Sequence, residues 1–160
     1  MIDKNQAVLN FLITCPLIQN SPLYFNFVNA KNNNNQFVTV GNDIYEQQSY
    51  IDGTIDKTYT FTLISFKSMS YNPMVKQQGY QDENVDDMAD VQSLIDWVNE
   101  QNELKNYPDF GEECIIDNMQ ALTDNPNLNS VDTTITPALA KYSVTIRINY
   151  LDNSKRLWNK

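Results

Sequence analysis

The chain has 160 residues and a formal net charge of −9, with 41% apolar and 19% charged residues. This length suits a single core, and we expect one domain over residues 1–160. No apolar run approaches the ~20 residues of a membrane-spanning helix, so no membrane association is expected. The acidity argues against a nucleic-acid-binding protein, because such proteins bind phosphates mainly through Lys and Arg.

The N-terminal region predicts a helix followed by a hairpin. Asp3 is placed to cap a helix from about Lys4 to Thr14, and Pro16 is expected to stop it. Strand-forming residues at 23–28 and 36–40 flank an asparagine-rich tip. This pattern favours two antiparallel strands joined at that tip.

Two long strands are predicted from alternation. Asp52 and Gly53 between apolar flanks predict a turn that leads into a strand from about Lys57 to Lys67. A second strand is predicted from Lys141 to Leu151. The apolar members of the two alternations are Tyr59, Phe61 and Leu63, and Tyr142, Val144, Ile146, Ile148 and Tyr150. Such alternation indicates one buried and one wetter face, and we expect the two strands to pair.

The middle of the chain predicts a loop, a helix and a short strand. Residues 69–83 have no clear period and are expected to form a long loop. Asn84 is the expected cap of a helix that runs to about Asn102, and Cys114–Ile116 predicts a short strand. The expected apolar face of the helix consists of Met88, Val91, Leu94, Ile95 and Val98. The fold class is therefore α/β of the α+β type, a mainly antiparallel sheet with two principal helices packed on one face.

The sequence contains no histidine and only four glycines. The lack of histidine excludes Ser-His and Cys-His nucleophile activation and histidine zinc ligands. The glycines form neither a dinucleotide-binding fingerprint nor a P-loop. Cys15 and Cys114 have no ligand spacing and are expected to be reduced thiols. We therefore expect no catalytic residue, no cofactor and no enzymatic activity.

An acidic cluster surrounds the predicted start of the second helix: Asp82, Glu83, Asp86, Asp87 and Asp90. Oxygen ligands of this kind suit Ca²⁺ or Mg²⁺. The alternative is a solvated helix start whose negative charges interact favourably with the helix dipole. Because the spacing matches no calcium-binding loop, we expect no metal site.

Two groups of residues outside the predicted elements are candidates for contacts with other proteins. The first consists of aromatic residues in predicted loops: Tyr71, Tyr80, Tyr107 and Phe110. These side chains either anchor an interface or fold back to cover the sheet edge. The second is a basic C-terminal tail, about residues 152–160, which is either frayed or a docking arm for an acidic neighbouring subunit.

Several stretches resemble a family of small structural proteins from phages of low-GC Gram-positive bacteria, often labelled minor capsid proteins. The likeness covers roughly residues 8–158. The stretches that carry it are Tyr50–Gly53, Lys57–Phe61, Leu94–Asn102, Asn106–Gly111 with Cys114, and Tyr142–Tyr150. Members of this family are similar in size and element order to tail terminators, which close the head-proximal end of the tail tube.

The resemblance implies a subunit that forms a homo-oligomeric ring, typically a hexamer, on the last ring of the tail-tube protein. It also implies a surface for the head-tail connector protein, a location in the tail or neck of the virion, and assembly in the bacterial host cytoplasm. Six copies at −9 each would total about −54, so DNA would pass through the ring without specific binding. No catalytic residues carry over from this family.

Two contact sites are expected on this interpretation. Tyr71, Met74 and Tyr80 are the expected contact with the tail tube, because aromatic and methionine side chains in a loop adapt to a partner surface. Lys155, Arg156 and Trp158 are the expected contact between subunits. The alternatives are another head-tail connector or tail-tube protein, or a small acidic phage-encoded inhibitor of a host protein.

Overall fold

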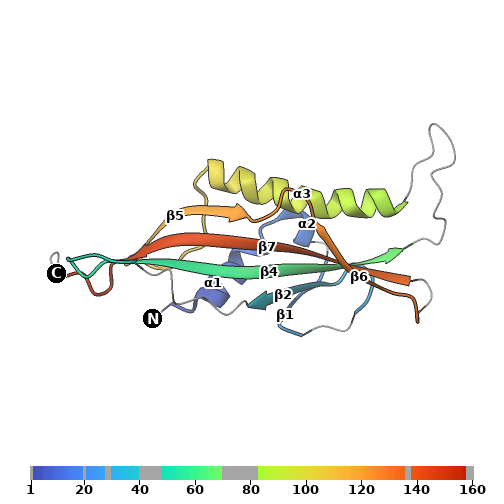
Figure 1. The fold of residues 1–160 in the computed structure, drawn as a ribbon, viewed down its shortest axis with the longest axis horizontal. Coiled ribbons are helices and arrows are strands. Elements are labelled where there is room, and N and C mark those ends of the chain that lie inside the picture. The colour runs from blue at the N-terminus through green and yellow to red at the C-terminus, as the bar shows by residue number, and fades with distance from the viewer. Residues whose placement is uncertain are drawn as a thin grey trace.

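A computed structural model describes residues 2–19, 21–27, 30–39, 48–69, 83–135 and 138–157. Its elements are α1 (Lys4–Leu12), α2 (Pro16–Gln19), β1 (Leu23–Phe25), β2 (Asn35–Thr39), β3 (Gln48–Ser49), β4 (Ile55–Met69), α3 (Glu83–Glu103), β5 (Cys114–Ala121), β6 (Asn127–Asp132) and β7 (Ala138–Asp152). Figure 1 shows them along the long axis of the molecule.

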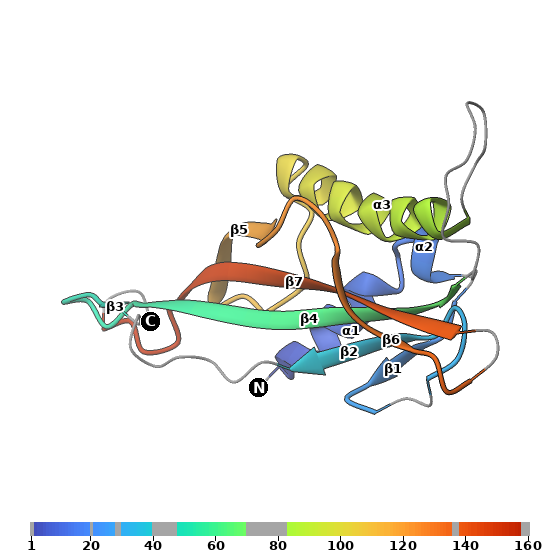
Figure 2. The same ribbon diagram turned by 45° about the vertical axis from the view of Figure 1, so that its right-hand side comes forward.

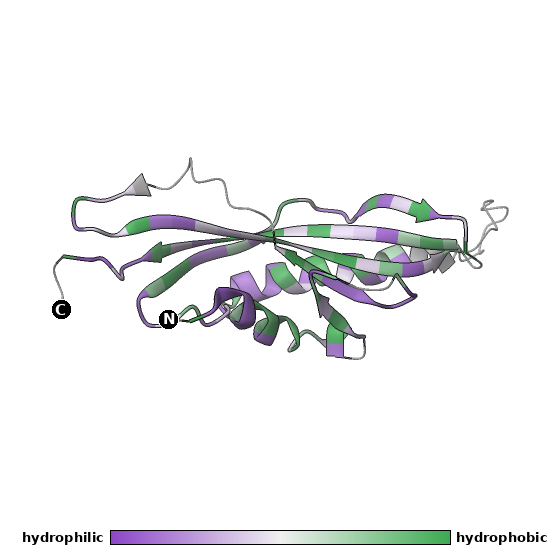
Figure 3. Cartoon of the chain, turned by 90° about the horizontal axis from the view of Figure 1, so that it is seen from below, coloured by the Kyte–Doolittle hydropathy of each residue, from purple (hydrophilic) through white to green (hydrophobic). Residues whose placement is uncertain are grey.

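The seven strands form one sheet in the order β1-β2-β4-β7-β5, with β3 beside β4 and β6 beside β7. Every pairing is antiparallel except that of β1 with β2. Helices α1 and α3 lie on the same face of this sheet, as the view from below shows (Figure 3). The predicted α+β class, with a mainly antiparallel sheet and helices on one face, is therefore confirmed.

The centre of the sheet is the long pair of β4 and β7. The two strands pair without interruption from Ile55 opposite Asp152 to Met69 opposite Ala138. Both predicted strands and their pairing are confirmed, and each strand extends beyond its predicted ends. All eight apolar residues named for the two alternations are buried, because they face the helices across the pleated sheet.

The N-terminal helix begins as predicted and ends earlier. The Asp3 carboxylate accepts a hydrogen bond from the Asn5 amide at 2.9 Å, which confirms the cap. Helix α1 ends at Leu12, and Pro16 then begins the short helix α2. Proline is tolerated at the first position of a helix because no hydrogen bond is required of its nitrogen there.

Helix α3 confirms most of the predicted apolar face. Val91, Leu94, Ile95 and Val98 are buried, but Met88 is 37% exposed. The prediction for Met88 is wrong because packing of this stripe begins only at Val91. The helix already includes Glu83, so Asn84 lies inside it and the predicted cap is also wrong.

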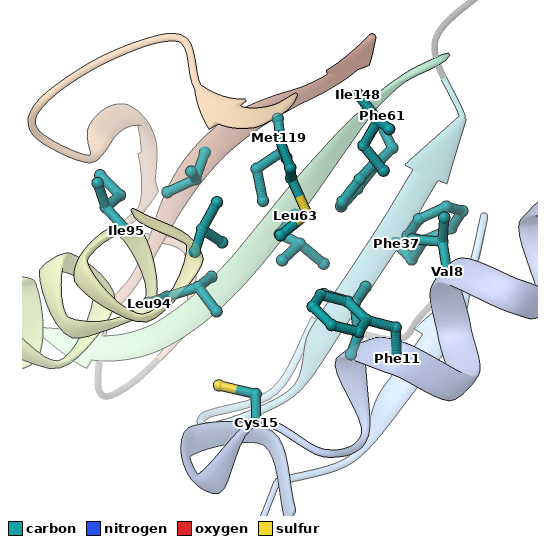
Figure 4. Close-up of a cluster of buried hydrophobic side chains, with 14 of the residues drawn as sticks. Val8, Phe11, Cys15, Phe37, Phe61, Leu63, Leu94, Ile95, Met119 and Ile148 are labelled. Atoms are coloured by element: carbon teal, nitrogen blue, oxygen red, sulfur yellow. The ribbon is translucent and has the colours of Figure 1, made fainter. Parts of the chain in front are cut away.

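One hydrophobic core joins both principal helices to the sheet. Figure 4 shows Val8 and Phe11 of α1, Leu94 and Ile95 of α3, and the strand residues Phe37, Phe61, Leu63, Met119 and Ile148 directed toward a common interior. The Phe11 and Trp97 ring centroids lie 5.1 Å apart, so the two helices also contact each other. Close packing of this kind fixes the helix layer on the sheet.

The predicted hairpin between residues 23–28 and 36–40 is wrong. Strands β1 and β2 are parallel, with Leu23 opposite Asn35 and Phe25 opposite Phe37. Asn26 adopts a φ of 59°, so the chain leaves the strand direction directly after Phe25. The Asn26 side chain then accepts a hydrogen bond from the Thr39 amide at 3.2 Å, which holds this crossing against β2.

The C-terminal half contains more strand than predicted. The short strand predicted at Cys114–Ile116 extends to Ala121 as β5. Strand β6 follows the turn that ends at Pro126 and was not expected, because all six of its residues are exposed and show no apolar alternation. Both strands pair with β7, β5 along its C-terminal part and β6 along its N-terminal part.

Candidate interaction surface

The structure places only part of the predicted contact residues. Tyr71, Met74 and Tyr80 lie outside the described residues, and so does Trp158. Lys155 and Arg156 belong to a segment, residues 153–157, that follows β7 and that we term the C-terminal clasp.

The clasp folds back onto the turn between β3 and β4. The Leu157 amide donates a hydrogen bond to the Asp52 carbonyl at 2.7 Å. The Arg156 Nε lies 3.2 Å from the Asp52 Oδ2 in an ion pair. The expectation of a frayed tail is therefore wrong for residues 153–157, and Arg156 has a partner within its own chain.

Gly53 allows this close approach. Its φ is +86°, a conformation that L-residues with a side chain rarely adopt. A Cβ atom at this position would lie 2.2 Å from the Lys155 carbonyl oxygen. The predicted Asp-Gly turn is confirmed, and the glycine is required by the clasp as well as by the turn.

Beside the clasp is an open apolar groove of about 590 Å³, which we term the tip groove. It is lined by Tyr50, Ile51, Asp52, Thr54, Ile115, Leu151, Asn153 and Arg156. Three of these are strongly exposed apolar residues: Tyr50 at 45%, Ile51 at 94% and Ile115 at 55%. Clustered exposed apolar side chains are typical of interaction sites rather than of free surface.

The tip groove lies where the strands leave the helix layer. β4 and β7 extend past the end of α3 as a narrow ribbon, with β3 at its tip (Figures 1 and 2). Leu151 and Ile115 are neighbours across β7 and β5. They belong to the face of the sheet opposite Tyr150 and Met119, so none of the helices in the described part of the chain covers them.

Charged groups on the helix side stiffen the same ribbon. Lys57 on β4 donates a hydrogen bond to Asp152 on β7. Burial opposes the charge on Asp152, but hydrogen bonds from Lys57 and Ser154 outweigh this effect and lower the Asp152 pKa to about 2. The Thr54 amide, helped by Arg156, lowers the pKa of Asp52. Both carboxylates are therefore charged at neutral pH.

Two of the aromatic interface candidates are structural. Phe110 is 5% exposed, and its ring packs edge-on against Tyr59 and Tyr150. The Tyr107 hydroxyl donates a hydrogen bond to Asn102 Oδ1 at 3.0 Å, beside the bond from the Met119 amide to the same oxygen. Phe110 therefore folds back over the sheet and is not an exposed interface anchor.

The acidic cluster at the start of α3 is described only in part. Asp87 and Asp90 are its members whose side chains the structure describes, and Asp90 is exposed. Within the described residues, no group of three or more Cys, Asp and Glu side chains is arranged to hold a metal ion. In the same part of the chain, no helix is both long and apolar enough to cross a membrane.

Sequence reasoning predicted Arg156 as a contact residue but missed the apolar residues of the tip groove. Ile115 and Leu151 lie in predicted strands, but the exposure of Ile115 and the partial exposure of Leu151 follow from which strands are neighbours and where the helix layer ends. Ile51 carried a signal, since an isoleucine inside a turn has no nearby core to enter.

Comparison with known proteins identifies no relative of this chain. No family model matches the chain. The curated proteins and the solved structures likewise contain no match. The geometry above and the sequence resemblance are therefore the basis for a functional proposal.

Proposed function

We propose that the chain is a structural subunit of a phage particle that caps the head-proximal end of the tail tube as a ring. On this proposal, the ring ends tube growth and offers its other side to the head-tail connector. The observation that carries the proposal is the projecting β4–β7 ribbon with the tip groove. A ring subunit needs an exposed surface that a neighbouring subunit or a tube ring covers, and the tip groove supplies one.

The clasp supports the same proposal because it makes the tip of the projecting ribbon rigid. An interface formed by a two-stranded projection requires that the projection hold one shape, because ordering a mobile segment on binding costs free energy. Arg156, Asp52 and Gly53 fix the tip, and Lys57 with Asp152 fixes the ribbon behind it. Lys155 is exposed beside this fixed tip and is a cation available for a neighbouring acidic subunit.

Deletion of the gene from the phage or prophage that encodes it tests this function. We expect complete heads and separate tails whose tubes have uncontrolled length, because a bare tube end keeps its addition surface. Electron micrographs of the lysate provide the measurement. Tails of normal length that are joined to heads would contradict the proposal.

Purified protein distinguishes the alternatives. Negative-stain images with and without isolated tail tubes should show rings at one end of each tube. Long open filaments of this protein alone would indicate a tail-tube protein instead. Absence from purified particles, with abundant free protein in infected cells, would indicate the acidic inhibitor.

A further inference from the structure

The face of the sheet opposite the helices carries a row of polar residues that includes Arg147, for which the described residues provide no ion pair. On β7 this face includes Thr145, Arg147 and Asn149, which alternate with the buried Val144, Ile146 and Ile148. Ile64, Phe66 and Leu139 form a small apolar cluster at one end of the face. Among the described residues, no helix covers the polar part (Figure 3).

Side chains that lie opposite one another on neighbouring strands form rows across this face. In the rows on either side of Arg147, the polar side chains form hydrogen bonds with one another. Thr58 donates to Asn149 at 3.2 Å, and Asn149 donates to Asn118 at 2.8 Å. In the other flanking row, the Thr62 and Thr145 hydroxyls lie 3.0 Å apart. The two rows therefore need no external partner.

The central row is different. Arg147 lies between Thr60 on β4 and Gln120 on β5. Its Nε is buried and has no hydrogen-bond partner, and the described residues offer its guanidinium no ion pair. The residue as a whole is only half-buried. The stem is thus held against the sheet while the cation faces outward without a counter-charge.

The opposite side of the molecule carries the complementary charge. Asp96, Glu100 and Glu103 are exposed on α3 at a spacing of four and three residues, which places them in one stripe. The last turn of α3 contains no basic residue. Negative side chains are unfavourable there because the C-terminal end of a helix is itself partially negative. Lys105 follows the helix, but neither glutamate has an ion pair within the described chain.

We infer that the α3 stripe of one copy contacts the sheet face of a second copy, with a carboxylate at or near Glu100 paired with Arg147. The occupant is a second copy because both halves of the charge pair are on this chain and lie on opposite sides of it. Two different faces that meet in this way give a heterologous contact, which closes into a ring when the rotation permits. This inference rests on the proposed ring but concerns contacts between subunits, not the contact with the tube.

Charge reversal tests the pairing. Arg147→Glu and Glu100→Arg should each weaken self-association by about tenfold or more, and the double variant should recover most of the loss. Sedimentation equilibrium up to about millimolar protein measures the dissociation constant. Lys31→Glu and Asp124→Arg make the same charge changes at exposed loop positions and should leave association nearly unchanged.

A folding defect is separable from an interface defect. Glu100→Arg should keep or raise the melting temperature of the monomer, because a cation suits the end of the helix, and yet it should weaken association. Arg147→Gln serves as a milder variant on the sheet face. Unchanged association in both single variants, no recovery in the double variant, or a wild-type chain that stays monomeric throughout would each overturn the inference. Rings that depend on this pair but do not cap tubes would refute the proposed function alone.

Discussion

Asp152 links the charge state of the ribbon to its stability. The residue is 8% exposed and its pKa is lowered to about 2, below the ~3.9 of an unfolded aspartate. Its stabilising contribution is therefore complete above about pH 5 and is lost as the pH falls toward 2.

We expect Asp152→Asn to lower the free energy of unfolding at pH 7 by about 2 kcal/mol. The loss of stability on acidification between pH 5 and 2 should become shallower in the same variant. Urea unfolding at a series of pH values measures both effects. Asp124→Asn, at an exposed position, is the control, and equal acid slopes in all three proteins would contradict the assignment.

Gly53 offers a second test at the scale of one residue. Gly53→Ala should destabilise the protein by about 1–3 kcal/mol, because alanine is strained at this φ and its Cβ meets a backbone oxygen. Gly111→Ala is the matched control: its φ is +92°, but the added Cβ would meet only the end of the Ile2 side chain at 2.8 Å. Thermal unfolding should show the larger loss for Gly53→Ala, and equal losses would exclude a specific contact with the clasp.

At the scale of elements, the clasp has one role within the chain and a proposed one between chains. Truncation after Ser154 removes the Arg156 ion pair and the Leu157 hydrogen bond. We expect the fold to persist with a loss of about 1–2 kcal/mol, since exposed ion pairs and single hydrogen bonds are each worth about 1 kcal/mol or less. Ring assembly, measured by light scattering, should weaken more than the stability of the fold, measured by circular dichroism.

Two single variants separate these roles. Arg156→Gln should lower stability, because Arg156 is paired with Asp52. Lys155→Gln should leave stability unchanged and affect assembly only. If truncated chains assemble into particles normally, the clasp is not an intersubunit contact.

The predicted contact with the tail tube falls in the sequence between β4 and α3, outside the described residues. Replacement of Tyr71, Met74 and Tyr80 by serine should preserve the fold and weaken capping of tube ends, because adaptable apolar side chains supply much of an interface's binding energy. Tail lengths in electron micrographs of phage that carry the triple variant measure the effect. Normal lengths with full infectivity would refute this assignment.

The elements that could be predicted are those whose burial repeats along the sequence. Tyr59, Phe61 and Leu63 alternate with threonines because β4 has one face on the core, so their phase is visible in the sequence. Strand β6 has no buried face, so its sequence shows no apolar alternation that would predict a strand. The parallel pairing of β1 with β2 depends on the left-handed conformation of Asn26, which is a property of one residue and its contacts rather than of a pattern.

The candidate surfaces were harder to predict for a related reason. Arg147 stands in a strand where alternation predicts a polar residue, so its type alone was unremarkable. What distinguishes it is the absence of an acceptor among its described neighbours, and those neighbours come from strands far apart in sequence. This arrangement of neighbouring strands cannot be predicted from a single sequence.

At the scale of the whole molecule, the net charge of −9 opposes the approach of identical copies. We therefore expect the purified protein to be a monomer or weak oligomer at low concentration and to form a ring when it meets a tube end. Light scattering with and without isolated tubes measures this difference. Stable rings at nanomolar protein in the absence of tubes would contradict the expectation.

The central position of β7 has a consequence for synthesis on the ribosome. β4, β5 and β6 all leave the exit tunnel before β7, yet each takes its place in the sheet by pairing with it. Until β7 emerges, the apolar faces of β4 and α3 lack the strand that completes their core, and closing such distant pairs is slow. The nascent chain should therefore be prone to aggregation until β7 emerges, and the sheet should complete its core in one step at that point.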